Sequence, residues 1–227
     1  MLKYLFAFLL LLGFAQSVSA ADVVVIAGQS GMLTFNQTAF INKYFALSGK
    51  TVVIQQCAIG GTYLYQHAQD ATQASFLTPS TNCRITLQAR KAAGDNIVGV
   101  VFWQGESDTI IYTSRTGFAT NVWAQDWLHW MRKTEAVYRE ALNQPDLPFV
   151  VLNLPTWTSP GCVAPGVNIS YYNLIKLAQN AANQLHRTSK VNLDDIKYTC
   201  GDLHVTGRPA DLVTISERAA QSFYDNF

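Results

Sequence analysis

The chain has 227 residues, of which 49% are hydrophobic and only 14% charged, and its formal net charge is +1. A typical globular chain is about 25% charged, so this composition argues against an acid-rich disordered chain and against a basic nucleic-acid binder. The length suits one ordinary domain with a substantial core.

Residues 1–20 have the organisation of a secretory signal peptide. Lys3 gives a positive start, an apolar run covers 5–12, and the segment 18–20 (VSA) offers small residues for cleavage. We expect cleavage after Ala20, which leaves a single domain over 21–227. The alternative is an uncleaved anchor helix, but the apolar run is shorter than the roughly 20 residues of a membrane span. The protein is therefore expected to be secreted or periplasmic and not attached to a membrane.

The rest of the chain alternates short apolar runs with longer amphipathic segments. The runs that read as buried strands, the last of them weaker, are 22–27, 51–55, 97–103, 148–154 and 191–196. The segments that read as helices are 36–47, 84–93, 117–142, 171–187 and 207–225. Trp123, Trp127 and Trp130 share one face of the third predicted helix, which we interpret as core packing. The alternation predicts an α/β fold, a parallel sheet covered by helices on both faces.

Four cysteines follow the predicted cleavage site: Cys57, Cys83, Cys162 and Cys200. An even number in an exported chain favours two disulfides. Of the three possible pairings we favour Cys57–Cys83 and Cys162–Cys200; the alternative is free buried cysteines. Neither a CxxC nor an HExxH spacing occurs, so we expect no metal site and no cofactor.

Polar and glycine residues follow every predicted strand. In parallel sheets ligands bind at the carboxyl ends of the strands, so these loops are expected to form one site. The loops are Gly28–Gly31, Ala58–Thr62, Gln104–Asp108, the Pro/Gly-rich segment 155–168, and Gly201–His204.

Ser30 lies between a strand and a helix, in a glycine-containing turn that can expose its hydroxyl. A serine nucleophile needs a base, and the base needs an orienting group. His204 follows Asp202 by two residues, and in an extended loop such side chains point the same way. Asp202 is then positioned to orient His204 toward Ser30. The alternatives are a helix-capping serine, a turn aspartate and a solvated histidine.

The other histidines after the predicted cleavage site are less suited to this role. His129 and His186 fall within predicted helices, where surface or packing roles are expected. His67 follows the second loop and remains a residue that could line the site. The chain order also differs from that of α/β-hydrolases, which carry GxSxG in mid-chain with the acid and histidine well apart.

Four short blocks together resemble the SGNH (GDSL-like) hydrolase superfamily: GQS at 28–30, AIGGT at 58–62, WQGESD at 103–108 and DLH at 202–204. The likeness is closest to its carbohydrate-esterase branch, which includes sialate O-acetylesterases and acetylxylan esterases. It extends from 26 to 206. The resemblance implies a flavodoxin-like, three-layer α/β/α fold with a five-stranded parallel sheet, and metal-free ester hydrolysis.

The same resemblance implies roles for individual residues. Ser30 would be the nucleophile, His204 the general base and Asp202 its partner. The oxyanion hole would combine the backbone N–H groups of Ser30 and Gly61, or Gly60 as the alternative, with a polar side chain of the third block, for which we expect Gln104. The residues expected to support the site are Gln29, Gly60, Gly105, Glu106 and Ser107.

The sequence departs from the superfamily pattern at two places. Ser107 stands where GxND motifs carry the asparagine that donates to the oxyanion. The usual DxxH aspartate is replaced by Gly201, so Asp202 is the natural substitute. Alternative partners for the histidine are Glu106, Asp194 and Asp195, while Glu106 and Asp108 are more simply explained as loop anchors.

The resulting hypothesis is a secreted, monomeric serine esterase that removes acetyl groups from a polysaccharide or from sialic acid, without nucleic-acid or membrane partners. The near-neutral chain has no strong field to steer a charged polymer, which favours a neutral polysaccharide. Alternatives are an exported lipase or thioesterase and a non-catalytic carbohydrate-binding protein. A flavodoxin-type nucleotide binder is weaker, because the first loop lacks GxGxxG.

Overall fold

The computed structural model describes residues 20–68, 79–110, 126–205 and 207–227. The predicted signal peptide up to residue 19 lies outside these residues. So does the first part of the helix predicted at 117–142, including Trp123.

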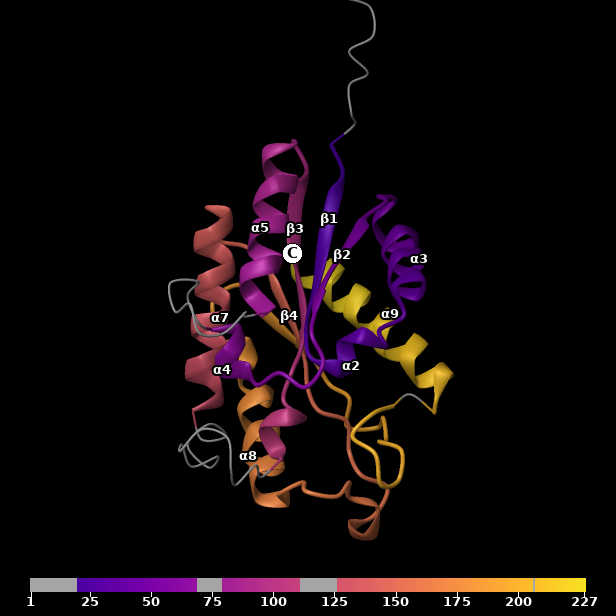
Figure 1. Ribbon diagram of the computed structural model, residues 1–227. Coiled ribbons are helices and arrows are strands. Elements are labelled where there is room, and N and C mark those ends of the chain that lie inside the picture. The colour runs from indigo at the N-terminus through magenta and orange to yellow at the C-terminus, as the bar shows by residue number, and fades with distance from the viewer. Residues whose placement is uncertain (1–19, 69–78, 111–125, 206) are drawn as a thin grey trace, which may run out of the picture.

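Five strands form one parallel sheet in the order β2-β1-β3-β4-β5 (Figure 1). Their bounds are β1 Asp22–Gly28, β2 Val53–Ala58, β3 Asn96–Trp103, β4 Phe149–Leu152 and β5 Thr188–Val191. β1 lies between two neighbours, and its residues Val23–Ala27 are fully buried. This explains why β1 reads as apolar on both faces, and it confirms the predicted parallel α/β sheet.

The predicted position of the fifth strand is wrong. The strand β5 covers Thr188–Val191, whereas the sequence favoured 191–196. Its polar side chains have partners, since Thr188 Oγ1 donates to Glu135 Oε1 at 2.8 Å and Ser189 Oγ lies 2.9 Å from Ser222 Oγ. Short polar edge strands of this kind carry little hydrophobic signal, and the apolar residues after Val191 are instead buried in the following loop.

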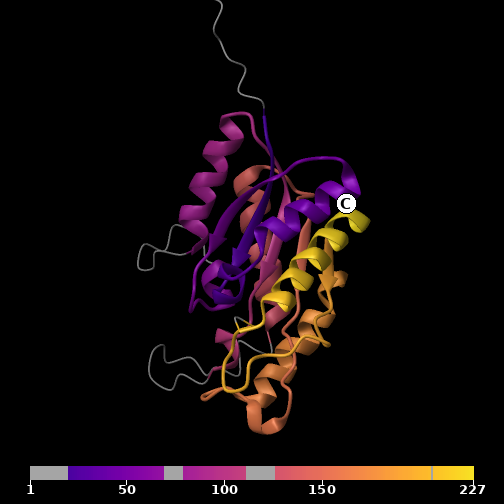
Figure 2. The same cartoon turned by 90° about the vertical axis from the view of Figure 1, so that its right-hand side faces the viewer.

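Helices cover both faces of the sheet (Figures 1 and 2). One face carries α3 (Gln37–Ser48) and α9 (Pro209–Asn226), and the other carries α5 (Pro79–Ala92) and α7 (Trp127–Leu142). The helix α8 (Ile169–Asn180) lies beside α7 near the carboxyl end of the sheet. The three-layer α/β/α arrangement expected from the motif blocks is therefore confirmed.

The helix predicted at 171–187 is shorter than expected. α8 ends at Asn180, and the short 3-10 helix η3 (Ala182–Gln184) follows it. Ala182 and Leu185 are buried in the core, which turns the chain toward β5. His186 consequently lies in an exposed turn, not on a helix.

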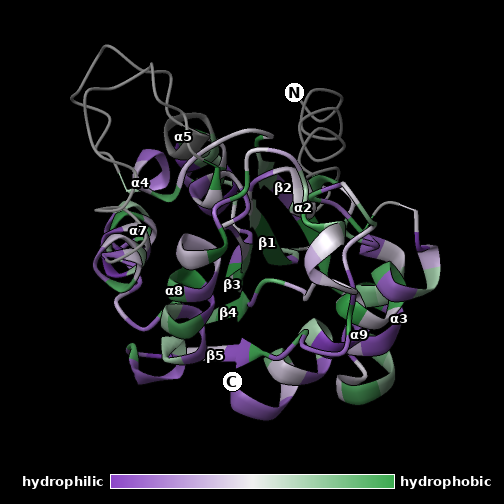
Figure 3. Ribbon diagram, turned by 90° about the horizontal axis from the view of Figure 1, so that it is seen from below, coloured by the Kyte–Doolittle hydropathy of each residue, from purple (hydrophilic) through white to green (hydrophobic). Residues whose placement is uncertain are grey.

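The core lies between the sheet and the two helical layers. Seen from the carboxyl ends of the strands, the hydrophobic central strand β1 lies between helices on both sides (Figure 3). Trp103 and Trp127 are among the largest fully buried side chains, and Trp130 packs partly buried against the same core. The interpretation of the tryptophan face as core packing therefore holds for the two residues that the structure describes.

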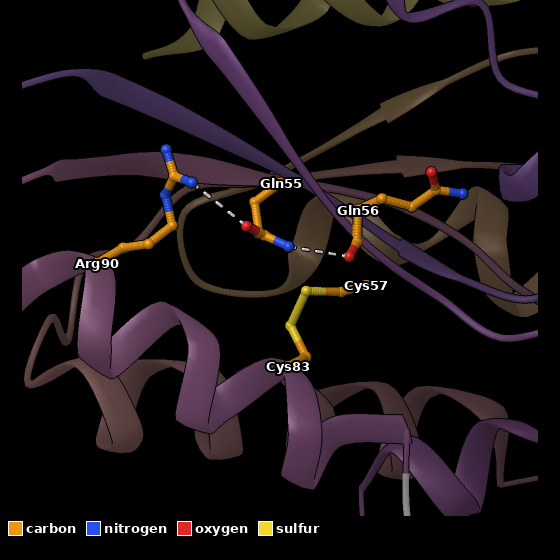
Figure 4. Close-up of a disulfide and its surroundings, with 5 residues drawn as sticks. All are labelled: Gln55, Gln56, Cys57, Cys83 and Arg90. Carbon is orange, nitrogen blue, oxygen red and sulfur yellow. Dashed lines mark hydrogen bonds between the residues drawn. A yellow bond between two sulfur atoms is a disulfide. The ribbon is translucent and has the colours of Figure 1, made fainter.

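The cysteines form both disulfides that the sequence favours, Cys57–Cys83 and Cys162–Cys200. The first ties the edge strand β2 to α5 (Figure 4). Beside it, the Gln55 side chain donates to the backbone carbonyl of Gln56 at 3.1 Å and so occupies an acceptor of the exposed edge. The second disulfide ties the short 3-10 helix η2 (Pro160–Cys162) to the start of the loop that contains Asp202.

The carboxyl ends of β1 and β3 approach each other closely. Gly28 ends β1 with φ +124°, and a Cβ at this position would lie 1.9 Å from the carbonyl oxygen of Trp103. Only glycine fits this approach. The Gln29 amide then donates to the same carbonyl at 3.1 Å, which fixes the start of the loop that carries Ser30.

Candidate active site

The loops at the carboxyl edge of the sheet enclose a cavity of about 270 Å³. Loops after β1, β2, β3 and β5 all contribute to it, as the position of the motif blocks predicts. Its lining residues are Gln29, Ser30, Gly61, Glu106, Ser107, Ile110, Leu203 and His204. A larger hollow of about 890 Å³ lies at the opposite edge, but among the described residues no histidine lines it.

Ser30, His204 and Asp202 form a continuous chain of contacts. Ser30 is the first residue of the short helix α2 (Ser30–Leu33), and its Oγ lies 2.8 Å from Nε2 of His204. Nδ1 of the same ring lies 2.7 Å from Oδ1 of Asp202. Both ring nitrogens are thus engaged, one by a hydroxyl and one by a carboxylate. This is the geometry that nucleophile, base and orienting acid require.

The loop that carries Asp202 and His204 is held by several local contacts. The amide of Asp202 donates to the carbonyl of Thr199 at 3.0 Å, and the Thr199 amide donates to the carbonyl of His204 at 3.2 Å. The Gly201 amide donates to the carbonyl of Cys162 at 2.9 Å, next to the Cys162–Cys200 disulfide. These contacts hold the backbone of the loop that carries the imidazole.

The alternative acidic partners are engaged elsewhere. Asp194 accepts from Lys176 Nζ at 2.7 Å. Asp195 forms a paired contact with Arg218, with both distances 2.6 Å, and this hydrogen bonding lowers the pKa of Asp195 to about 2. Among the acids considered from the sequence, Asp202 is the one in contact with the His204 ring.

The remaining histidines lie outside the cavity. His67 ends the short helix α4 (Leu64–His67), is fully buried, and has its Nε2 atom 2.9 Å from Thr62 Oγ1. Burial lowers the pKa of His67 to about 4, so the ring is neutral at neutral pH. His129 is exposed on α7, and His186 pairs with Asp146 at 2.6 Å.

The contacts of Gln104 do not support its expected role as an oxyanion donor. Gln104 is fully buried, and its Nε2 atom lies 3.0 Å from Gln29 Oε1, 2.7 Å from the Thr62 carbonyl oxygen and 2.9 Å from Asp108 Oδ2. Three protein acceptors thus surround the two N–H groups of the amide, and Gln104 is not among the residues that line the cavity. Its role is instead to join the first three loops.

Ser107, from the third block, carries a hydroxyl at the wall of the cavity. It begins the short 3-10 helix η1 (Ser107–Thr109) and lines the cavity together with Gly61. Its backbone amide donates to Gln29 Oε1 at 3.0 Å. A Cβ on Gly60 would lie 3.7 Å from the Cβ of Ser30, so this glycine packs against the serine, and Gly105 packs against the side chain of Gln179.

Two buried carboxyl groups lie within the third loop. Burial raises the pKa of Glu106 to about 8 and that of Asp108 to about 6. Asp108 accepts from the Gln104 amide and from the Leu64 backbone at 3.0 Å, so it anchors the loop as the sequence indicates. Glu106 accepts from Gln29 Nε2 at 2.5 Å and also lines the cavity.

Sequence reasoning missed the apolar part of the cavity wall. Ile110 and Leu203 line it, each only partly buried. Leu203 lies between Asp202 and His204 in the chain, and Ile110 follows the third block directly. Apolar residues adjacent to polar motif residues were the available signal, but which of them face the cavity depends on the loop conformations.

Within the described ranges, no helix combines the length and the apolar character needed to span a membrane. The same residues contain no cluster of three or more His, Cys, Asp or Glu side chains arranged to hold a metal ion.

Comparison with protein families identifies one match. Residues 20–225 match the model of the family described as carbohydrate esterase, sialic acid-specific acetylesterase. No curated protein sequence matches the chain.

Several solved structures share the fold. A protein from Arabidopsis thaliana is 16% identical, with a TM-score of 0.65, and the match covers 92% of this chain and all of that one. A carbohydrate acetylesterase from Xanthomonas citri is 15% identical, with a TM-score of 0.61 and coverage of 90% and 56%. A carbohydrate esterase family 2 enzyme with a carbohydrate-binding domain, from Corynascus thermopiles (Myceliophthora fergusii), is 16% identical, with a TM-score of 0.55 and coverage of 90% and 66%.

Proposed function

Because the chain belongs to the sialic acid-specific acetylesterase family of carbohydrate esterases, we propose that it hydrolyses carbohydrate acetyl esters with Ser30, His204 and Asp202. The observation that carries this proposal is the contact of Ser30 Oγ with His204 Nε2 at 2.8 Å, in a ring whose Nδ1 faces Asp202 at 2.7 Å. The family supports esterase activity, and these contacts support the proposed roles of the three residues.

The reaction has two steps. His204 Nε2 accepts the hydroxyl proton as Ser30 Oγ attacks the acetyl carbonyl carbon, and a tetrahedral oxyanion forms. The bond to the sugar oxygen then breaks, and His204 gives its proton to the leaving hydroxyl. Water next attacks the acetyl carbon of the acetyl-enzyme and gives a proton to His204. The bond between the acetyl carbon and Ser30 Oγ then breaks, His204 returns its proton to Ser30 Oγ, and acetate leaves. Asp202 holds the Nδ1–H tautomer and stabilises the protonated ring.

Three donors are proposed for the oxyanion. They are the backbone N–H groups of Ser30 and Gly61 and the hydroxyl of Ser107, all from residues that line the same cavity. Donors arranged before the reaction stabilise the charge without reorganisation, and each is typically worth about 10²–10³ in rate. Ser107 takes the place first expected for Gln104, whose amide already has three acceptors.

The size of the cavity supports a short acyl group. At about 270 Å³ it is below the range of about 300–1,000 Å³ in which drug-sized ligands bind, and Ile110 and Leu203 give it apolar walls. Hydrolysis of p-nitrophenyl acetate, butyrate and octanoate tests this. We expect kcat/KM to fall steeply from acetate to octanoate, whereas a maximum at octanoate would favour the lipase or thioesterase alternative.

The substrate is proposed to be an acetylated neutral polysaccharide, although the family is named for sialic acid. The support is the near-neutral charge of the chain, +1 over all 227 residues. Acetate release from acetylated xylan, pectin, chitin fragments and O-acetylated sialic acid tests the preference. A clear preference for the sialic acid would overturn this part of the proposal alone.

Export with cleavage after Ala20 is also proposed. The apolar run of residues 5–12 supports it, and the two disulfides are typical of oxidising compartments. N-terminal sequencing of protein recovered outside the cytoplasm is expected to begin at Ala21. An intact Met1 in the exported protein would contradict this part of the proposal.

A further inference from the structure

The carboxyl group of Glu106 lies against the two residues that flank Ser30 in the chain. Its Oε2 atom accepts from the side chain of Gln29, the residue before Ser30, at 2.5 Å. Its Oε1 atom would lie 3.1 Å from a Cβ on Gly31, the residue after Ser30. This contact leaves little room for any side chain at Gly31, so the carboxyl group is fitted between both neighbours of the serine. Glu106 also lines the cavity that Ser30 and His204 share.

The surroundings of Glu106 disfavour a charge. The side chain is 2% exposed, and in the described part of the chain its Oε1 atom has no hydrogen bond of normal geometry. Asp108 on η1 is a second buried carboxyl that acts on it, and no lysine or arginine acts on it among the described residues. Hydrogen bonding with Tyr198, in the loop after β5, and with Gln29 lowers the pKa of Glu106, but the effect of burial is larger. Tyr172 on α8 lies close enough to be affected by the charge of Glu106.

We infer that Glu106 is a positioning residue that works as a neutral carboxylic acid, holding Gln29 and Gly31 on either side of Ser30 without adding negative charge to the cavity. The inference rests on the proposed function of Ser30. A neutral acid can accept from Gln29 through Oε2 while its proton stays on Oε1. A carboxylate in the same place would oppose the negative charge that develops on the substrate oxygen in the cavity.

Titration of this group gives the inference a pH signature. Burial, reinforced by Asp108, raises the pKa of Glu106 to about 8, so the neutral form dominates below that pH and the carboxylate above it. The neighbouring titratable groups do not change charge near pH 8. Burial raises the pKa of Asp108 only to about 6, and it raises the pKa values of Tyr172 and Tyr198 well above 10. Activity should therefore fall as the pH rises through about 8.

Three variants and a control test the inference. In Glu106→Gln the amide oxygen can accept from Gln29 and the amide nitrogen can replace the acidic O–H, so the neutral geometry is kept at every pH. Glu106→Ala removes the carboxyl group that contacts Gln29 and lies beside Gly31. Ser30→Ala removes the proposed nucleophile. The matched control is Glu135→Gln, because Glu135 is a buried carboxyl with a raised pKa that contacts Arg139 and Thr188 at the far end of β5.

The measurement is the pH profile of kcat and KM for p-nitrophenyl acetate between pH 5 and 9.5. We expect the wild type and Glu135→Gln to lose activity above pH about 8, and Glu106→Gln to lack this limb while keeping kcat at pH 7 within about threefold. Glu106→Ala should lower kcat at pH 7 at least tenfold. A limb that persists in Glu106→Gln, or a Glu106→Gln kcat as low as that of Glu106→Ala, would overturn the inference.

The outcomes also distinguish a failure of the proposed Ser30 mechanism from a failure of the role inferred for Glu106. If Ser30→Ala retains wild-type activity, the proposed function fails. If Ser30→Ala is inactive while Glu106→Gln keeps the limb, only the role of Glu106 fails. Should Glu106→Ala not fold, infrared difference spectra of wild type minus Glu106→Gln at pH 7 decide: a protonated carboxyl band supports the inference, and a carboxylate band in its place contradicts it.

Discussion

His204 Nδ1 lies 2.7 Å from Oδ1 of Asp202, a residue only two positions earlier in the chain. The same carboxylate oxygen also accepts from the backbone amide of His204 at 3.2 Å. The base and its orienting acid therefore belong to one loop, and only the contact with Ser30 joins distant parts of the sequence. The alignment of the proposed triad thus depends on how firmly this single loop is held.

The first prediction concerns the orienting acid. Asp202→Asn should lower kcat about 10²–10⁴-fold with little change in KM, because the amide cannot hold the Nδ1–H tautomer of His204. Asp195→Asn is the control, since Asp195 pairs with Arg218 away from the cavity. Steady-state kinetics with p-nitrophenyl acetate provide the test. Equal losses in the two variants would mean that Asp202 has no special role.

The second prediction concerns the two disulfides. The double variant Cys162→Ser/Cys200→Ser should lower kcat several-fold at a temperature where it remains folded, because Cys200 is two residues from Asp202. The variant Cys57→Ser/Cys83→Ser should keep kcat. Both should lose roughly 2–4 kcal/mol of unfolding free energy, measured by urea denaturation. An unchanged kcat in the first double variant would show that the loop is held without its disulfide.

The third prediction concerns Ser107. Ser107→Ala should lower kcat roughly 10–10³-fold with a smaller effect on KM, because the proposed hydroxyl contact forms with the oxyanion. Ser189→Ala provides the matched control, as its hydroxyl contacts Ser222 at 2.9 Å on the opposite edge of the sheet. If kcat is unaffected by Ser107→Ala, the third oxyanion donor lies elsewhere.

The fourth prediction concerns acid stability. Burial holds the pKa of His67 at about 4, below its value of about 6.5 in the unfolded chain, so the unfolded state binds more protons between these values. The contribution of neutral His67 is complete above about pH 6.5 and is lost as the pH falls toward 4. It amounts to at most about 3 kcal/mol for a shift of this size.

Urea denaturation of the wild type and His67→Gln at pH 7 and pH 4.5 measures this contribution. The difference in unfolding free energy between the two proteins should shrink at the lower pH. Comparing the two proteins cancels the contributions of other groups, including that of Glu106, which has the opposite sign because its native pKa is raised. A difference that does not change with pH would contradict the assignment of His67 as a buried neutral ring.

Much of the fold was predictable because its central strands are apolar on both faces. β1 and β3 have this pattern, and helical periodicity marks α7 and α9. The edge strand β5 has polar side chains whose partners, such as Glu135 for Thr188, come from other elements. No local pattern records such partners, so the strand was assigned to the apolar residues that follow it.

The loops that form the candidate site could be predicted from the sequence, but not the contacts of every side chain in them. The order of the motif blocks after the strands led to Ser30, Asp202 and His204, and the structure brings these three side chains into contact. The role of Gln104 was not predictable. Its amide has acceptors in three different loops, and only their packing decides whether it faces the cavity or lies beneath it.

In the proposed reaction, Ser30 carries the acetyl group during hydrolysis of a carbohydrate acetyl ester. The most direct measurement is acetate release from acetylated xylan by the wild type and by Ser30→Ala, with circular dichroism to show that both are folded. We expect steady release by the wild type and a rate at least about 10³-fold lower for Ser30→Ala. Acetate release by a folded Ser30→Ala protein at the wild-type rate would contradict it.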